Sequence, residues 1–150
     1  MKLVLATQNP KKLKEMNEIL SHLGVEVVSE AELGVRIEVE ETGETFTDNA
    51  RLKATAVMQA TGLPAVADDS GLCVDALNGG PGVYSARFGG EGLDDKGRYT
   101  LLLEMLRGQT DRAAHFHTSI VCAFPNGDEL VCEGECPGTI AFAPMGEGGF

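Results

Sequence analysis

The fold is decided by the stretch Leu3-Val4-Leu5-Ala6-Thr7-Gln8-Asn9-Pro10-Lys11-Lys12 near the start of the chain. Residues 3–6 are a continuous apolar run, typical of a strand that is buried on both faces of a sheet. Asn9 can cap a helix, and Pro10 suits the first helical position. The stretch therefore predicts a buried strand, a tight turn and a helix that ends at Gly24.

Strands and helices alternate along the rest of the chain. Strands are expected at residues 25–28, 65–67, 113–124 and 130–133, with an alternating apolar and acidic segment at 37–41. Helices are expected from near Thr45 to Gly62, and from Asp94 or Asp95 to Arg107 with Leu101, Leu102, Met105 and Leu106 facing the core. Pro125-Asn126-Gly127-Asp128 predicts a hairpin, and the glycine-rich residues 78–92 a surface loop. This order predicts an α/β domain with a mixed sheet.

Length and charge limit the function. The 150 residues, 43% of them hydrophobic, can bury one sizeable core, so we expect a single domain over residues 1–150. The formal net charge of -11 repels a phosphate backbone, which argues against a nucleic-acid partner. A small polyanion can still bind where lysines, backbone amides and a metal ion offset the field.

The four cysteines and the amino-terminal residues add little evidence about function. We expect Cys73, Cys122, Cys132 and Cys136 to be reduced, buried thiols. Cys132 and Cys136 could bind a metal, but they would supply only two of the four ligands of a tetrahedral zinc site. The apolar run at residues 1–6 is too short for a signal peptide or a membrane span, so a cytoplasmic location without membrane contact is expected.

The turn at residues 7–12 is the first candidate site. Amide groups at a helix N-terminus bind anions, and Lys12 adds a full positive charge beside them. The turn lacks the glycines of a Walker loop. An ordinary capped helix explains the same residues equally well, so both interpretations stay open.

Ala67-Asp68-Asp69-Ser70-Gly71 is the second candidate site. We expect its two carboxylates to leave the end of an apolar strand, where ligands bind in α/β sheets. Such oxygen ligands suit Mg²⁺. A simple turn explains the serine and glycine but does not require two adjacent carboxylates, so we favour the metal site.

A third group combines an acidic run with one face of a helix. Glu38, Glu40 and Glu41 precede the helix on which Asn49 and Lys53, four residues apart, share a face. That face can reach a metal-bound phosphate together with a glutamate. The alternative is that these residues form a polar, solvent-exposed surface, which is the usual meaning of such a pattern.

His115 and His117 have the same parity in a predicted strand, so both side chains point to one side of the sheet. Metal ligation is one interpretation. A partly exposed sheet face is the favoured one, because no third ligand of a suitable type lies nearby in the sequence.

Five motifs follow one another along the chain. They are Thr7-Gln8-Asn9-Pro10-Lys11-Lys12, Glu40-Glu41-Thr42-Gly43-Glu44-Thr45-Phe46, Asn49-Ala50-Arg51-Leu52-Lys53-Ala54, Ala67-Asp68-Asp69-Ser70-Gly71-Leu72 and Gly82-Val83-Tyr84-Ser85-Ala86-Arg87. Each motif is weak alone, but the ordered set is specific. Together they closely resemble the non-canonical purine nucleoside triphosphate pyrophosphatases, the inosine/xanthosine triphosphatase family. The resemblance covers the whole chain.

The resemblance implies an elongated α/β fold, in which helices flank a central mixed sheet and two lobes enclose a nucleotide-binding cleft, usually in a homodimer. It implies hydrolysis of ITP, XTP and dITP to the monophosphate and pyrophosphate with Mg²⁺, or Mn²⁺ in its place. Carried over by position, Asp69 is the general base and a metal ligand, Glu40 is the second acidic ligand, and Asp68 completes the metal site. The implied substrate contacts are Thr7, Gln8, Asn9, Pro10, Lys11, Lys12, Asn49, Lys53 and Ser70.

Members of this family continue past the Gly-Gly-Phe found at residues 148–150 into segments that recognise the purine base. The resemblance therefore implies a domain that is incomplete at its carboxyl end. One alternative is a shortened nucleotide-binding or partner subunit without turnover. Another is the related septum-formation-associated pyrophosphatase family, but its Ser-x-Ser-x-x-Arg type loop is replaced here by residues 7–12, which argues against it.

Overall fold

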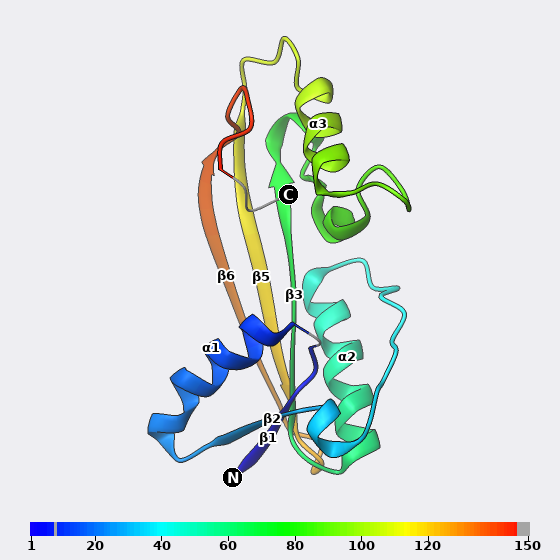
Figure 1. Cartoon of the computed structure of the whole chain (residues 1–150), viewed down its shortest axis with the longest axis vertical. Helices are drawn as coiled ribbons and strands as arrows, with labels where there is room; N and C mark the ends of the chain where they lie inside the picture. Colours follow the sequence, from blue (N-terminus) through cyan, green and yellow to red (C-terminus); the bar gives the residue numbers. More distant parts are fainter. Residues whose placement is uncertain (8, 147–150) are drawn as a thin grey trace. The chain divides into compact units, whose positions relative to one another are not determined.

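The computed structural model describes residues 1–7 and 9–146 (Figure 1). Its strands are β1 (Lys2–Leu5), β2 (Glu26–Ser29), β3 (Ala65–Val74), β4 (Gly80–Pro81), β5 (Ala113–Ala123) and β6 (Glu129–Thr139). Its α-helices are α1 (Pro10–Leu20), α2 (Phe46–Thr61) and α3 (Asp95–Met105). Short 3-10 helices lie at Ser21–Leu23, Ala31–Leu33, Asp75–Leu77 and Gly82–Arg87. No helix in the described part of the chain is long and apolar enough to cross a membrane.

Among the described residues, the strands form one mixed sheet, as the sequence predicts. Its order is β2-β1-β3-β5-β6, and β4 pairs with β3 off this path. β1 runs parallel to both of its neighbours, β2 and β3, whereas β4 runs antiparallel to β3. Leu3, Val4 and Leu5 are all buried because α2 packs on one face of β1 and α1 on the other, which accounts for the apolar run.

Tertiary contacts divide the chain into two compact units. The first contains Met1–Asp69 and Ser119–Glu133, and the second contains Ser70–Thr118 and the chain from Gly134 onward. β3, β5 and β6 therefore contribute residues to both units. A single domain over residues 1–150 stays a prediction.

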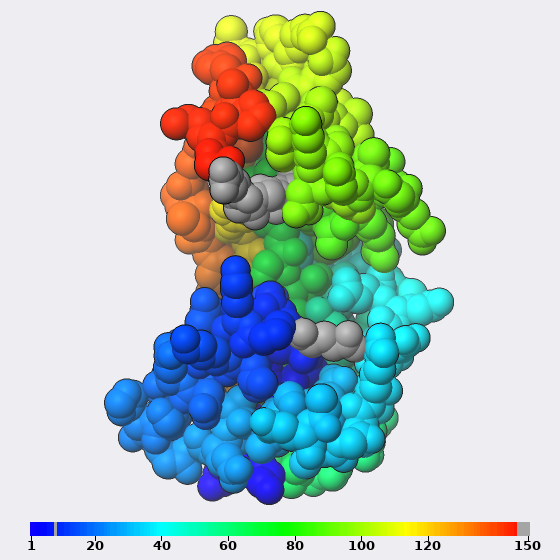
Figure 2. Space-filling view, in the orientation of Figure 1, coloured from blue at the N-terminus to red at the C-terminus, as the bar shows by residue number. Residues whose placement is uncertain are grey.

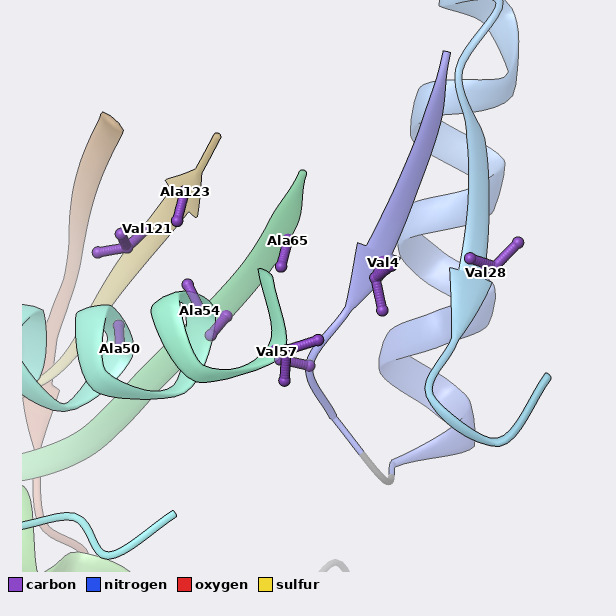
Figure 3. Close-up of a cluster of buried hydrophobic side chains, with 10 residues drawn as sticks. Val4, Val28, Ala50, Ala54, Val57, Ala65, Val121 and Ala123 are labelled. Carbon is purple, nitrogen blue, oxygen red and sulfur yellow. The ribbon is translucent and has the colours of Figure 1, made fainter. Parts of the chain in front are cut away.

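Small apolar side chains form one core of the first unit (Figure 3). They come from α2 and from four strands: Val4, Val28, Ala50, Ala54, Val57, Ala65, Val121 and Ala123, with Ala6 and Ala67. Ala50 and Ala54 are fully buried and four residues apart, so α2 turns one narrow face toward the strands. This close packing fixes the helix that carries Asn49 and Lys53.

Helix α1 covers the opposite face of the same strands. Leu3 and Leu5 point away from Val4 because side chains alternate along a strand. They form a second core cluster with Val27 and Val66, against which Leu13, Met16 and Leu20 of α1 pack. The apolar spacing of Leu13, Met16 and Leu20 is therefore confirmed as the partly buried stripe of α1, but Leu23, predicted to continue it, lies beyond the helix and is 73% exposed.

The second unit has a core of its own, around Val74, Leu102, Leu106 and Ala114. The expectation that Met105 faces the core is wrong, since its side chain is 47% exposed. Helix α3 ends at Met105 rather than Arg107, and only one side of this final turn faces the core.

Three predicted elements differ from the structure. Residues 37–41 form no strand, and β3 extends to Val74, so Asp68 and Asp69 lie inside a strand rather than leaving its end. β6 likewise continues to Thr139. β3 and β6 both flank the long strand β5, which offers backbone partners far beyond their apolar residues, and this pairing overrides local propensity.

The cysteines also differ from their predicted burial. Cys73 is buried and Cys122 is partly buried, but Cys132 and Cys136 are exposed. Both lie on β6, an edge strand whose residues are all exposed. All four thiols are free, as expected.

Candidate active site

The turn after β1 is held in shape by its own polar groups. The Asn9 amide donates to Thr7 Oγ1 at 3.2 Å, and the Lys11 amide donates to Asn9 Oδ1 at 3.0 Å. Asn9 is thus the N-cap of α1, and Pro10 occupies its first turn, as predicted. The positive end of the helix dipole lies at this turn. Gln8, predicted as a substrate contact, lies outside the described residues.

Lys12 joins the turn to the middle of β3. Register pairs Val4 with Ala65 and Leu5 with Val66, which brings the end of β1 level with the aspartates. Lys12 Nζ lies 2.6 Å from Asp68 Oδ2, and these side chains are 44% and 19% exposed. Solvent therefore reaches the lysine, so an anionic ligand can reach it as well.

Lys53 approaches Asp68 from helix α2. Its Nζ donates to the Asp68 backbone carbonyl at 2.6 Å and lies 3.1 Å from Glu41 Oε1. Two ammonium groups, from elements on opposite faces of the sheet, thus meet at one residue of β3. Each ammonium group also faces a carboxylate, Lys12 that of Asp68 and Lys53 that of Glu41, so the lysines balance the acidic groups of the site.

Asn49 links Asp69 to the segment that precedes α2. The Asn49 side chain is fully buried, and its Nδ2 donates to Asp69 Oδ2 at 3.2 Å. Its Oδ1 accepts the Gly43 amide at 2.7 Å. A Cβ at Gly43 would lie only 2.7 Å from Asn49 Oδ1, so this close approach requires glycine.

The pKa of Asp69 is raised above its ordinary value of 3.8. Burial is the largest cause of this rise; the charge of Lys53 and the hydrogen bond from Asn49 oppose it, and the charges of Glu41 and Asp68 add to it. A carboxylate whose ionised form is disfavoured in this way is a better proton acceptor and metal ligand.

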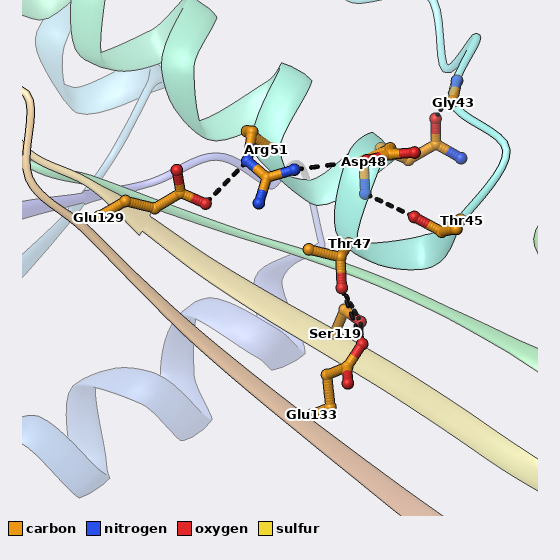
Figure 4. Close-up of polar contacts among 9 residues, drawn as sticks. Gly43, Thr45, Thr47, Asp48, Arg51, Ser119, Glu129 and Glu133 are labelled. Atoms are coloured by element: carbon orange, nitrogen blue, oxygen red, sulfur yellow. Dashed lines mark hydrogen bonds and ion pairs between the residues drawn. The ribbon is translucent and has the colours of Figure 1, made fainter.

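Polar contacts anchor α2 to β5 and β6 (Figure 4). Thr47 Oγ1 lies 2.8 Å from Ser119 Oγ and donates to Glu133 Oε1 at 2.8 Å. One turn further along α2, Arg51 Nε donates to Glu129 Oε1 at 2.8 Å. Sequence analysis missed these positioning residues, because contacts between residues more than 70 positions apart leave no local pattern.

Two cavities adjoin the turn after β1. One of about 330 Å³ is lined by residues that include Thr7, Glu38 and Lys53. The other, of about 550 Å³, lies between the start of α1 and residues 29–36. In Figure 2, α1 and the segment that follows β2 lie next to each other on the viewed face.

Several predicted site residues do not join this cluster. Glu40 is exposed, and its side chain makes no hydrogen bond or ion pair with the residues that the structure describes. Its neighbour Glu41, which belonged to the same predicted group but which the resemblance did not make a ligand, contacts Lys53 instead. Ser70 belongs to the second unit, where its Oγ lies 2.7 Å from Thr118 Oγ1. Pro10 and Lys11 are exposed beside the turn.

The site therefore combines a helix N-terminus, two lysines and two neighbouring aspartates within the first unit. Lysines and helix amides bind phosphates, and carboxylates bind hard divalent cations. Such a set suits a polyphosphate held together with a metal ion.

Known proteins are similar to this chain in sequence. A dITP/XTP pyrophosphatase of Desulforamulus reducens is 53% identical over 152 residues, a match that covers 100% of this chain and 76% of the relative. The dITP/XTP pyrophosphatase of an Exiguobacterium species is 49% identical over 150 residues, with the same coverage.

Solved structures share the fold. The Ham1 protein of Staphylococcus aureus superposes with a TM-score of 0.92 at 40% identity, covering 100% of this chain and 77% of that one. A HAM1 protein from Coxiella burnetii gives a TM-score of 0.93 at 43% identity, covering 100% and 78%. The match to the Ham1 family extends over residues 3–150, and the chain belongs to that family.

Proposed function

We propose that this protein hydrolyses non-canonical purine nucleoside triphosphates (ITP, XTP and dITP) to the monophosphate and pyrophosphate, and so clears them from the nucleotide pool. The observation that carries the proposal is the meeting of Lys12 and Lys53 at Asp68, directly beside Asp69 with its raised pKa. The names of the relatives support the substrate class.

In the proposed reaction, Lys12, Lys53 and the first amides of α1 hold the triphosphate. Asp69 accepts a proton from water as the water oxygen bonds to the α-phosphorus. The bond from that phosphorus to the oxygen of the leaving pyrophosphate breaks in the same displacement. The two ammonium groups offset the charge that develops on the leaving group.

The acidic residues fit a hard divalent cation, because every ligand they offer is oxygen. We propose that Asp69, Asp68 and Glu40 hold Mg²⁺, or Mn²⁺ in its place. When bound, the ion adds positive charge beside the phosphates. The hydrogen bond from Asn49 keeps the Asp69 carboxylate oriented throughout.

We further propose that Thr7, Gln8, Asn9, Pro10 and Lys11 contact the triphosphate, whereas Asn49, which is fully buried, acts by positioning Asp69. The protein would act in the cytoplasm as a homodimer and would bind neither nucleic acid nor membranes. Its net charge of -11 supports the lack of a nucleic-acid partner. The exposed edge strand β6 supports the homodimer, since a second copy can cover it.

The test measures pyrophosphate released from ITP, XTP, dITP, GTP and ATP, with and without Mg²⁺. Release that requires Mg²⁺ and favours ITP, XTP and dITP is expected. Binding of ITP without release would replace the proposal with a nucleotide-binding subunit that does not turn over. Equal release from ATP and ITP would remove the assigned specificity.

A further inference from the structure

Outside the site described above, the second unit brings two imidazoles and a carboxylate together. His115 and His117 lie on one side of β5, and Glu135 lies on the neighbouring strand β6. Glu135 Oε1 is 3.1 Å from His117 Nδ1 and 3.9 Å from His115 Nε2. The three potential ligand atoms all lie within 4.8 Å of one another.

Glu135 supplies the third ligand that the local sequence lacks. It is 18 residues from His117, and the hairpin between β5 and β6 returns it to the same place. The geometry points to a transition-metal site at His115, His117 and Glu135, suited to Zn²⁺ and separate from the proposed Mg²⁺ site.

The spacing of the ligand atoms is close to what zinc requires. Zinc bonds of about 2.0–2.1 Å in a tetrahedron separate neighbouring ligand atoms by roughly 3.3 Å. The contact between His117 and Glu135 already meets this spacing, whereas His115 Nε2, 3.9 Å from Glu135 Oε1, must move closer to bind the same ion. Three protein ligands leave the fourth position to water.

Hydrogen bonding alone accounts for this cluster less well. His117 and Glu135 are within hydrogen-bond distance, but His115 Nε2 is too far from Glu135 Oε1 for a hydrogen bond. One cation between the three groups would bind all of them. The two imidazoles are partly buried, with side chains 31% and 18% exposed, whereas the Glu135 side chain is 59% exposed and keeps the cluster open to an ion from solvent.

The donor set determines the class of metal. Two imidazole nitrogens and one carboxylate oxygen favour Zn²⁺, Co²⁺ or Ni²⁺, whereas Mg²⁺ prefers oxygen ligands alone. Cys136 follows Glu135 directly on β6, so its side chain points to the opposite face of the strand. The expected ligands are therefore nitrogen and oxygen without sulfur.

The experiment is calorimetric titration of the full chain with ZnCl₂ in excess Mg²⁺, which occupies oxygen-only sites. One Zn²⁺ per chain is expected, and His115→Ala, His117→Ala and Glu135→Gln should each weaken binding at least about tenfold. His22→Ala and Glu91→Gln change exposed residues of the same types outside the cluster and should leave the affinity unchanged. Absence of zinc binding, or equal binding by the three site variants and the wild type, would overturn the site.

Two measurements on the wild-type protein keep the test independent of variant folding. In nitrogen-15 spectra of the imidazoles, Zn²⁺ should shift the signals of His115 and His117 but not those of His22. With Co²⁺ as the probe, the absorption spectrum should lack the intense thiolate-to-metal band. Shifts confined to His22, or a strong thiolate band, would assign the metal to other residues and refute the inference.

Discussion

Asn49 donates a hydrogen bond from Nδ2 to Asp69 Oδ2 at 3.2 Å, while its Oδ1 accepts the Gly43 amide. One buried amide therefore fixes both the carboxylate of β3 and the segment before α2. The hydrogen bond favours the ionised form of Asp69, but burial, the largest influence, disfavours it. The carboxylate is thus oriented and at the same time held in an environment that opposes its charge.

Replacing Asp69 by Asn should abolish turnover and leave the fold intact. The change removes the proposed base and one ligand charge but keeps the size of the side chain. We expect kcat for ITP to fall by about 10²–10⁴-fold or more, measured as pyrophosphate release, with an unchanged circular dichroism spectrum. A kcat near that of the wild type would show that Asp69 is not the base.

The same substitution should make the protein more stable at neutral pH when divalent metal is absent. Because the pKa of Asp69 is raised in the fold, the native state holds this proton more tightly than the unfolded state does. Its contribution to stability is fully present below the ordinary pKa of 3.8 and is lost as pH rises through the folded value. The difference between the Tm of Asp69→Asn and that of the wild type should therefore shift in favour of Asp69→Asn as pH rises.

Thermal melts of both proteins across this pH range, in a chelating buffer, measure the effect. Glu91→Gln, a change at an exposed carboxylate, is the control and should follow the wild type. If the wild type instead gained stability over Asp69→Asn with rising pH, the environment of Asp69 would favour its charge.

Lys12→Met should raise KM for ITP by about tenfold to hundredfold. This is the loss of affinity expected when one hydrogen bond between charged groups is removed. Lys12 touches Asp68 in the site, whereas Lys14, on the same helix, is 79% exposed and lies 4.0 Å from Glu18. Lys14→Met is thus the matched control for loss of one positive charge on α1. Steady-state kinetics at several salt concentrations would compare them, and equal effects of both substitutions would exclude a specific contact by Lys12.

Local sequence patterns predicted the elements that depend on local physics. Asn9 caps α1, Asp94 caps α3, and the predicted turn joins β5 to β6 through the hydrogen bond from the Phe124 amide to the Asp128 carbonyl. Each of these features depends on residues within a few positions of one another. The family resemblance was confirmed as well, by relatives and solved structures.

Local sequence patterns failed to predict the features that depend on pairing between distant parts of the chain. The sequence predicted that a strand ends at Asp68 and Asp69, because polar residues are rare in buried strands. In the structure, β3 continues past both residues and pairs with β5. The partner of His115 and His117 was missed because Glu135 reaches them only through the hairpin. In the same way, adjacent Glu40 and Glu41 cannot be told apart without knowing where Lys53 lies.

These two glutamates allow a direct test of the metal site. Glu40 is exposed and available to an ion, whereas Glu41 lies 3.1 Å from Lys53. If Glu40 is a ligand, Glu40→Gln should raise the Mg²⁺ concentration for half-maximal rate at least about tenfold. Glu41→Gln should mainly raise KM for the nucleotide, because it loosens the partner of Lys53. Titration of activity with Mg²⁺ in both variants separates these effects, and the reverse pattern would transfer the ligand role from Glu40 to Glu41.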